Sequence, residues 1–481
     1  MATRKIGAAS LQRLMGGWKA DAGRAPAYRQ IEQALRLLIL DGRLPIGIRM
    51  PGERNLAPEL GVSRTTVAAA YAMLREQGFL ASRHGSGSIV RLPRTVPQQA
   101  EELGKAEIDF SIAALPAPKE VHAAYAAALA ELPRHLPGIG YEPAGLPDLR
   151  AEIAARYARR GVPTSPDEIL VTQGAQHGLV LLLGLLMKPG GRVVVDHPTY
   201  SKALDAIANA SCQPVPIPLP AYGWDLDQLE AAIDRNGAQL AYLLPDFHNP
   251  TGRCMDLEGR RRVSAIAART GCRIVVDETM ADLWLERPPP PPLAAFDRAG
   301  LVISLGSMGK SFWGGLRIGW IRAGRELIAA LAASRAAIDM GSPIIEQIAA
   351  TVLLHDAEAS LRARRAAIRE QRDHLLERVR EQLPDWRIQS PEGGLSAWAE
   401  LPRALSTALA AEAYSLGVRI APGSRFGVGG AFERFVRLPY ALPTPLLTEA
   451  VDRVALAWER VSQGPARRRS RIDEAGLTVA I

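Results

Sequence analysis

The sequence predicts an α/β protein in which a small, mostly helical N-terminal unit precedes a large unit built on a mostly parallel β-sheet. The chain has 481 residues, which is too many for a single ordinary hydrophobic core. From Ile108 onward, short unbroken apolar runs alternate with helical stretches. Such runs are typical of parallel strands that are buried on both faces. Before that point the apolar residues recur at helical spacing and are interrupted by turn residues.

The N-terminal unit is predicted to consist of three helices followed by a β-hairpin. Residues 1–25 show no strong periodicity, and we expect them to be mobile or to form a short leader helix. Ser63 is a suitable N-cap for the third helix, which is expected to end near Gln77. The other predicted elements are helices over 26–42 and 52–60 and strands over 78–80 and 85–90.

Composition marks the boundaries of the large unit. Residues 92–107 contain prolines, glutamines and charges without a pattern, which is typical of a linker. The large unit is expected to span 108–462, and the basic tail 463–481 is expected to be disordered. The predicted strands of the large unit are 169–171, 192–195, 240–244, 274–276 and 301–304.

The net charge of +8 lies entirely in the N-terminal part of the chain. Residues 1–91 contain 14 Lys and Arg against 6 Asp and Glu, whereas the remaining residues are neutral overall. A basic unit joined to a neutral one indicates that only the small unit meets a polyanion. A solubilising charge run is the alternative.

Cysteine usage and hydropathy favour a cytoplasmic protein. The three cysteines lack CxxC spacing, which indicates reduced thiols and predicts neither a disulfide framework nor a zinc site. The longest apolar run, near 179–187, is too short to cross a bilayer, and no signal peptide opens the chain. We therefore expect no membrane association and no metal.

Helix, turn and a second helix opening with Ser63-Arg64-Thr65-Thr66 match helix-turn-helix geometry. The second helix of such a pair lies in the major groove with its N-terminal side chains on base edges. Arg64 can contact guanine with two hydrogen bonds, and the threonines can contact phosphates or thymine methyl groups. Arg83 lies where a wing would reach the minor groove or the backbone. The spacing alone also fits an ordinary helical hairpin.

Residues suited to pyridine-cofactor chemistry follow the predicted strands of the large unit. Lys310 can form a Schiff base with an aldehyde, and Arg317 can hold a phosphate. The backbone of Gly174-Ala175-Gln176, at a helix start, can cradle an anion. Asp277 can keep a pyridine nitrogen protonated, and Asn249 can bond a phenolic oxygen. A helix N-cap explains Asp277 alone, and a plain turn explains Asn249 alone, but turns do not explain the whole series.

The stretches 47–67, 77–80 and 85–90 resemble the GntR family of winged helix-turn-helix regulators, and the resemblance covers nearly all of residues 26–91. It implies a domain that binds double-stranded operator DNA. The DNA contacts expected in this segment are Arg49, Arg54, Ser63, Arg64, Thr65, Thr66 and Arg83. An ordinary solvated arginine remains an alternative for Arg49 or Arg54.

Residues 108–460 resemble the fold-type I, aspartate-aminotransferase-like enzymes that use pyridoxal 5'-phosphate (PLP). The resemblance implies large and small subdomains and makes Lys310 the internal aldimine lysine. Asp277 would pair with the pyridine nitrogen, Asn249 would bond the phenolic oxygen, and Tyr200 would stack on the ring. The phosphate would be held by Gly174, Ala175, Gln176, Ser307 and Arg317, and by Tyr141 from the partner subunit. Arg437 would bind the effector carboxylate.

One position departs from this pattern. These enzymes usually carry a tyrosine shortly after the aspartate, which donates to the phenolic oxygen. The sequence here is Asp277-Glu278-Thr279-Met280, so that donor is missing or supplied from elsewhere. The departure casts doubt on tuning for full transamination.

A GntR-like unit followed by an aminotransferase-like unit resembles the MocR subfamily of bacterial regulators. The resemblance implies a homodimer that acts in the cytoplasm, associates with the nucleoid when bound to DNA, and senses PLP or an amino compound through an aldimine at Lys310. We expect at most residual transaminase half-reactions. The alternative is an active PLP-dependent aminotransferase with an accessory DNA-binding module. A third interpretation, a repressor whose large domain has lost PLP, is disfavoured by the intact Lys310, Asp277, Asn249 and Arg317.

Overall fold

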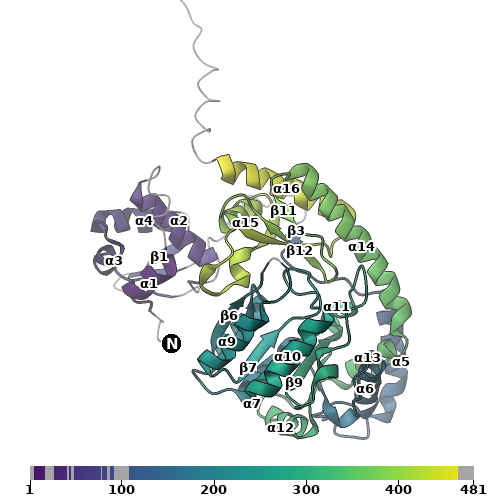
Figure 1. The fold of residues 1–481 in the computed structure, drawn as a ribbon. Coiled ribbons are helices and arrows are strands. Elements are labelled where there is room, and N and C mark those ends of the chain that lie inside the picture. The colour runs from purple at the N-terminus through teal and green to yellow at the C-terminus, as the bar shows by residue number, and fades with distance from the viewer. Residues whose placement is uncertain are drawn as a thin grey trace, which may run out of the picture. The chain divides into compact units, whose positions relative to one another are not determined.

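The computed structural model describes residues 5–16, 26–40, 43–44, 48–76, 78–83, 87–90, 108–220 and 222–463. These residues form two compact units, whose ribbons are shown in Figure 1. The first contains the described residues up to 90 together with 405–417 and 457–463, and the second contains 108–404 and 418–456. The predicted linker 92–107 and nearly all of the predicted tail lie outside the described residues.

The N-terminal segment contains the predicted helices and a hairpin, but the first strand of the hairpin begins at Leu80, and the predicted strand residues 78 and 79 lie in the turn before it. Its elements are α1 (Ala8–Met15), α2 (Ala27–Leu40), α3 (Glu53–Leu60), α4 (Arg64–Glu76), β1 (Leu80–Arg83) and β2 (Gly87–Val90). Strands β1 and β2 pair antiparallel, with Leu80 opposite Val90. Apolar residues from all four helices and both strands form one buried cluster, in which Leu35, Leu56 and Leu74 are fully buried. Tyr71 adds a polar contact, because its hydroxyl donates to the carbonyl oxygen of Pro51 at 3.0 Å.

The leader helix expected within residues 1–25 is α1, and it belongs to the core of this segment. Its residues Leu11 and Met15 are buried in the same cluster as α2, α3 and α4. The Arg43 guanidinium donates to the carbonyl oxygen of Leu14 at 3.3 Å, which satisfies one carbonyl that the end of the helix leaves open. The periodicity of these few apolar residues is too short to predict that packing from the sequence.

The large unit is built on a seven-stranded sheet with the strand order β4-β10-β9-β8-β7-β5-β6. Strand β10 is antiparallel to both of its neighbours, and the other pairs are parallel, so the sheet is mostly parallel as predicted. The strands are β4 (Ile169–Thr172), β5 (Arg192–His197), β6 (Gln213–Pro218), β7 (Leu240–Leu243), β8 (Arg273–Asp277), β9 (Val302–Ser307) and β10 (Gly319–Arg322). The five predicted runs all form strands, whereas β6 and β10 lack the unbroken apolar pattern.

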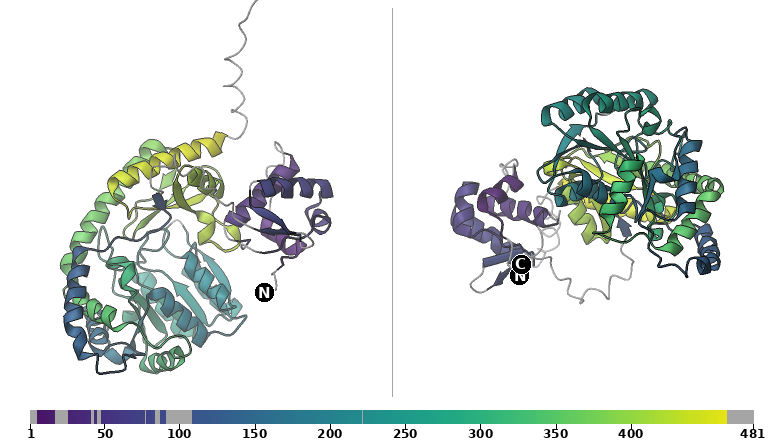
Figure 2. Two further views of the ribbon diagram at one scale, coloured as in Figure 1. Left: turned by 180° about the vertical axis from the view of Figure 1, so that it is seen from behind. Right: turned by 90° about the horizontal axis from the view of Figure 1, so that it is seen from below.

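Helices cover both faces of this sheet, as the views in Figures 1 and 2 show. One face packs against α5 (Lys119–Glu131), α6 (Pro147–Arg159), α9 (Leu226–Asn236), α10 (Leu257–Thr270) and α13 (Ile344–His355). The other packs against α7 (Ala175–Leu186), α8 (Ser201–Asn209) and α12 (Arg325–Arg335). Both faces are therefore dry, which explains the continuous apolar runs of the central strands.

A second, five-stranded sheet has the order β11-β12-β14-β13-β3. Its strands are β3 (Ile108–Phe110), β11 (Arg387–Ile388), β12 (Ser396–Glu400), β13 (Val418–Pro422) and β14 (Phe435–Pro439). The remaining helices are α11 (Met308–Ser311), α14 (Ala357–Gln382), α15 (Ser406–Ser415) and α16 (Thr444–Gln463). Strand β3 pairs parallel with β13, so residues that are distant in sequence meet next to the site described below.

Three further features bear on the expectations from composition. All three cysteines, Cys212, Cys254 and Cys272, are free thiols. In the described part of the chain, no helix combines the length and the hydropathy that a membrane crossing requires. The same residues contain no group of three or more His, Cys, Asp or Glu side chains placed to hold a metal ion.

Candidate cofactor site and DNA-reading helix

A cavity of about 190 Å³ lies at the carboxyl ends of the strands of the large sheet. Parallel strands bring the loops that follow them to one edge, where ligands of open α/β sheets bind. The cavity collects most of the residues predicted for the cofactor. These are Gly174, Ala175, Gln176, Tyr200, Asn249, Asp277, Ser307, Lys310 and Arg317.

Lys310 lies on the single turn α11, directly after β9. Its Nζ donates to the carbonyl oxygen of Ala113 at 2.6 Å. Burial and, to a smaller extent, the nearby Arg437 cation lower the pKa of Lys310 to about 8, while Asp277 acts in the opposite direction. An amine with this pKa is partly neutral near pH 7 to 8, and the neutral amine is the form that attacks an aldehyde.

Asp277 ends β8 and is held by two donors. The Tyr242 hydroxyl donates to Oδ2 at 2.6 Å, and the backbone N–H of Thr279 donates to Oδ1 at 3.0 Å. Tyr242 lines the cavity and is 1% exposed, and burial next to Asp277 raises its pKa well above the usual value. Sequence reasoning missed Tyr242 because it lies inside the apolar run of β7. The two donors hold the carboxylate in one orientation at the cavity wall.

An anion cradle forms where α7 begins. Gly174 is its N-cap with a φ of 87°, in the left-handed region that favours glycine. A Cβ on Gly174 would meet the Arg317 guanidinium at 3.5 Å, and Gly319 passes so close that its own Cβ would lie 2.6 Å from the Gly174 backbone. Arg317 donates to the carbonyl oxygen of Gln173 at 2.8 Å. Free N–H groups at a helix start and a guanidinium together suit a phosphate.

Ser307 and Gln176 also lie at this edge of the cavity. Ser307 Oγ accepts from the backbone N–H of Gly309 at 3.1 Å and caps α11. Gln176 donates through Nε2 to the carbonyl oxygen of Lys202 at 2.9 Å, while its buried Oε1 has no hydrogen-bond partner. An unpaired buried oxygen in the cavity wall is an acceptor for a bound group. Lys202 itself is exposed and pairs with Asp205 at 2.8 Å.

Arg437 of β14 approaches the cavity from the second sheet. Its guanidinium donates to Asn249 Oδ1 at 3.2 Å and to the carbonyl oxygen of Ser111, and it lies 5.0 Å over the Phe426 ring. Burial lowers the pKa of Arg437 to about 10, and Arg425 adds to that shift. Its Nε is buried without a partner. A buried guanidinium with an unused donor suits an anionic group such as a carboxylate.

Two aromatic predictions have different outcomes. Tyr200 precedes α8 and lines the cavity, and burial raises its pKa. Tyr141 is 57% exposed and is not part of the cavity wall of its own chain. Its predicted role on the partner subunit's cofactor stays a prediction.

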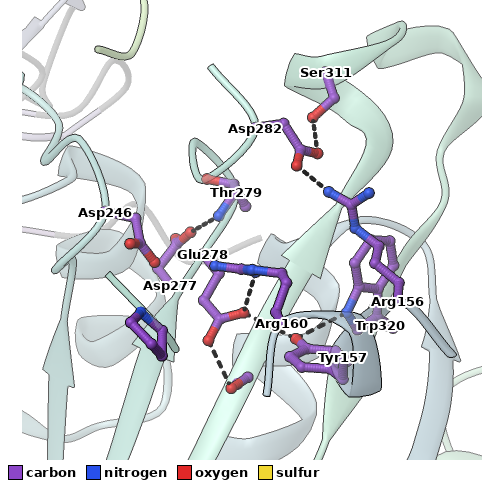
Figure 3. Close-up of polar contacts among 12 residues, drawn as sticks. Arg156, Tyr157, Arg160, Asp246, Asp277, Glu278, Thr279, Asp282, Ser311 and Trp320 are labelled. Atoms are coloured by element: carbon purple, nitrogen blue, oxygen red, sulfur yellow. Dashed lines mark hydrogen bonds and ion pairs between the residues drawn. The ribbon is translucent and has the colours of Figure 1, made fainter. Parts of the chain in front are cut away.

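The residues after Asp277, where related enzymes carry a tyrosine, lie in two different places. Thr279 and Met280 line the cavity. Glu278 lies instead in a buried polar cluster, which Figure 3 shows, where it accepts from Tyr157 at 3.0 Å and from Ser304 at 2.9 Å. Burial raises the pKa of Glu278, while Arg160 at 3.5 Å opposes that rise. Neither Thr279 nor Met280 supplies a phenolic donor.

This cluster continues to the segment that carries Lys310. Asp282 accepts from Ser311 Oγ at 2.9 Å and pairs with Arg156, as the dashed lines in Figure 3 mark. Trp320 donates through Nε1 to the Tyr157 hydroxyl at 3.2 Å. The polar groups behind the cavity are thus joined to one another, which holds the loops after β8 and β9 in place.

In the N-terminal segment, α4 presents the residues predicted to read DNA. Ser63 Oγ accepts from the backbone N–H of Thr66 at 3.1 Å and contacts the hydroxyls of Thr65 and Thr66 at 2.7 Å each. Arg64 is exposed, and its Nε lies 3.7 Å from Glu53. Val67, Tyr71 and Leu74 face the core, which leaves the opposite side of the helix open.

The other predicted DNA contacts lie outside α4. Arg54 is exposed on α3, and Arg49 is half-buried beside β2. Arg83 ends β1, and its side chain lies outside the described part of the structure. A capped helix with an open polar side is what insertion into a major groove requires.

The large unit therefore has the fold of the PLP-dependent aminotransferases, and the small one is a winged helix-turn-helix. Residues 119–454 match the family of class I and II aminotransferases, and residues 27–90 match the gntR family of bacterial regulatory proteins. Among solved structures, LysN, the alpha-aminoadipate aminotransferase of Thermus thermophilus, is similar, with a TM-score of 0.69 and 29% identity. The similarity covers 76% of this chain and 95% of that one, and that structure contains N-(5'-phosphopyridoxyl)-L-leucine.

Relatives in sequence include proteins named as transcriptional regulators. The HTH-type transcriptional regulator YisV of Bacillus subtilis is 30% identical over 78% of this chain and 84% of its own length. The probable rhizopine catabolism regulatory protein MocR of Rhizobium meliloti is 30% identical over 62% of this chain and 65% of its own length. The chain belongs to the MocR subfamily of GntR-type regulators, in which a DNA-binding unit is fused to a class I and II aminotransferase unit, and its cofactor is PLP.

Proposed function

We propose that this protein is a transcriptional regulator that senses PLP, or an amino compound bound to PLP, at Lys310 and changes its hold on operator DNA. The observation that carries the proposal is the presence, in one chain, of an open helix-turn-helix face and a cavity with an amine, a carboxylate and an anion cradle. An enzyme that acts only as a catalyst does not need an open helix-turn-helix face.

The fit of the residues to PLP assigns a role to each. PLP supplies an aldehyde that an amine captures and a pyridine ring that withdraws electrons when it is protonated. Lys310 would be the capturing amine, Asp277 would keep the ring nitrogen protonated, and Asn249 would bond the phenolic oxygen. Tyr200 would stack on the ring, and Arg437 would hold the carboxylate of the effector. The cradle for the phosphate consists of Gly174, Ala175, Gln176, Ser307 and Arg317, with Tyr141 reaching it from the partner subunit of a homodimer.

Regulation then follows from differential affinity. A ligand shifts an equilibrium between two arrangements only if it binds one of them more tightly. Lys310 and Arg437 both donate to backbone carbonyls of the loop after β3, at Ala113 and Ser111 respectively. A ligand that engages the two side chains competes with those contacts. One arrangement of the protein keeps these contacts, and the arrangement with bound ligand has lost them. The ligand therefore changes the energy difference between the two arrangements.

The direct test is binding of the purified protein to DNA from upstream of its own gene at fixed salt. It is measured without ligand, with PLP, and with PLP plus a panel of amino acids and amines. We expect sequence-selective binding that changes with PLP or with one amine. Binding that is weak, salt-sensitive and independent of sequence would contradict the proposal.

An active aminotransferase remains the second candidate because Lys310 can move protons as well as capture an aldehyde. Over 65% of its own length, the chain is also 30% identical to aromatic-amino-acid aminotransferase 1 of Thermococcus litoralis, of which the match covers 77%. Sustained keto-acid production at ordinary enzyme turnover would favour this candidate over the regulator.

Capture of PLP should depend on pH through the Lys310 amine. Because burial and the Arg437 charge lower the pKa of Lys310 to about 8, the reactive neutral form increases as pH rises through that value. We expect the rate of PLP uptake by apoprotein to rise between about pH 7 and 9 and then level off. In Arg437→Met the like charge is gone, so the midpoint should move to higher pH. If the pH midpoint of PLP uptake were the same in Arg437→Met and wild type, Arg437 would not influence the pKa of Lys310.

Arg64→Ala should weaken binding to operator DNA by about 1–3 kcal/mol and relax the choice of base, because a bidentate contact to guanine is lost. Competition of operator variants in an equilibrium binding assay measures both effects. Arg54→Ala is the matched comparison, since an exposed arginine on α3 is expected to meet phosphate and to weaken all sequences alike. Unchanged base discrimination in Arg64→Ala would remove that residue from base readout.

A further inference from the structure

The segment before α1 extends the wing of the DNA-binding unit. Lys5 forms a parallel bridge with Arg49, and Arg49 forms an antiparallel bridge with Ile89 of β2. The backbone N–H of Ile6 donates to the carbonyl oxygen of Arg49 at 3.1 Å, and that of Met50 donates to Ser88 at 2.9 Å. Three extended segments therefore lie side by side, and the outer one precedes the residues that match the gntR family.

The register decides which side chains share a face. Residues directly opposite each other on neighbouring strands point to the same side, and successive residues alternate. Met50 and Val90 are buried in the core. Their neighbours Arg49 and Ile89 therefore face outward, and Lys5, which pairs with Arg49, faces outward with them. Lys5 is exposed, and the Arg49 guanidinium passes within 3.4 Å of the point where Gly87 would carry a Cβ.

This arrangement places two cations next to each other at the wing. Like charges on directly opposed residues destabilise a sheet. Among the residues that the structure describes, no ion pair is recorded for Lys5 or Arg49. A polyanion lying along this face would relieve the repulsion, and residues 1–91 carry the whole positive charge of the chain.

The position of Lys5 is held from behind. Helix α1 begins at Ala8, and its residues Leu11 and Met15 are buried among α2, α3 and α4. The Arg43 guanidinium ties the other end of the helix through the Leu14 carbonyl. A cation on an ordered backbone loses less conformational entropy on binding than one on a free arm.

We propose that Lys5 is a DNA contact: with Arg49 it forms a two-cation strip at the wing that binds the phosphodiester backbone of duplex DNA, and α1 is the anchor that positions it. The contact adds affinity and not base selectivity, because phosphates carry no sequence information. The inference rests on the proposed DNA-binding function and adds a segment that the helix-turn-helix itself does not include.

The test is the salt dependence of binding by the full-length protein to two duplexes of equal length, upstream DNA and an unrelated sequence. Each phosphate contact contributes about 0.9 to the slope of log K against log of salt concentration. For each subunit whose wing lies on the DNA, we expect Lys5→Ala to make the slope shallower by about 0.9 on both duplexes, with the preference between them unchanged. Arg36→Ala is the matched control, because it removes one positive charge that is already paired with Glu32 at 3.3 Å.

An identical slope in Lys5→Ala and wild type would overturn the proposal, as would an equal change in Arg36→Ala. Amide exchange of the peptides that cover α2 to α4 checks that the Lys5 variant keeps its fold. Failure of the proposed function looks different: wild type would then not distinguish the two duplexes, while the Lys5 effect on the slope remains measurable on either.

Discussion

Lys310→Ala should abolish the visible absorbance of covalently bound PLP and, with it, every change in DNA affinity that PLP or an amine produces. Among the residues that line the cavity, Lys310 is the only lysine. The pKa of its amine is lowered to about 8, so a fraction of the amine is neutral and can capture an aldehyde. Absorbance spectra and DNA titrations of the same preparation measure both effects. DNA affinity without ligand should be largely unchanged, because the residues proposed to contact DNA are on other elements.

Lys202→Ala is the control for this variant. Lys202 lies next to the cavity but is exposed and paired with Asp205, so its removal should leave the spectrum and the ligand response intact. Two outcomes would contradict the assignment of Lys310. One is a spectrum that survives Lys310→Ala, and the other is a ligand response that persists without the spectrum. Loss of DNA binding in step with loss of folding would make the role of Lys310 structural.

Asp246→Ala should destabilise the large unit by about 3–5 kcal/mol, because it leaves a buried guanidinium without its counter-charge. Asp246 pairs with Arg260 at 2.6 Å, and both side chains are fully buried. Burial acts to lower the pKa of Arg260, but the charge and hydrogen bond of Asp246, together with the more distant Cys254 and Glu278, raise it overall. Calorimetry of the full-length protein should show a clearly lower melting temperature for the large unit.

Two comparisons separate this loss from general damage. Arg262→Ala removes an exposed partner of Asp227 and should cost less than about 1 kcal/mol. The double variant Asp246→Leu, Arg260→Met removes both charges, so it should be more stable than Asp246→Ala alone. If the single and double variants were equally unstable, the buried charge would not be the cause.

Asp246 also connects stability to the cofactor site. It lies three residues before Asn249, and Arg260 further binds the carbonyl oxygens of Pro245 and Met255 at 3.4 and 3.1 Å. The ion pair therefore holds the loop that carries Asn249 into the cavity. We therefore expect Asp246→Ala to weaken PLP binding as well as to lower the stability of the large unit.

The cofactor site was largely predictable because its residues follow strands. Unbroken apolar runs mark the strands, and the polar residue that ends each run must lie at the carboxyl edge of a parallel sheet. This pattern predicts that Asp277, Asn249 and Lys310 lie together. Tyr242 escaped this reasoning, since a tyrosine inside an apolar run has the pattern of a core residue. Its hydroxyl shows a polar role only when Asp277 lies 2.6 Å away.

The second sheet and two strands of the first were not predictable in the same way. Strand β6 alternates proline with apolar residues and lies at the edge of the sheet, where a missing N–H is tolerated. Strand β10 is short and antiparallel to both of its neighbours. Edge and antiparallel strands lack the continuous apolar pattern, so periodicity does not reveal them.

By itself, the sequence determined the class of this protein through local patterns: a capped recognition helix, a wing with glycines, and a lysine, an aspartate and an asparagine at strand ends. Only the tertiary structure decided which partners those residues have. Arg437 reaches Asn249 across 188 residues of sequence, Lys310 reaches Ala113 across 197, and Lys5 lies beside Arg49. Local patterns reflect backbone preferences over a few residues. Such distant contacts depend on how whole sheets and helices pack, and no local pattern encodes that.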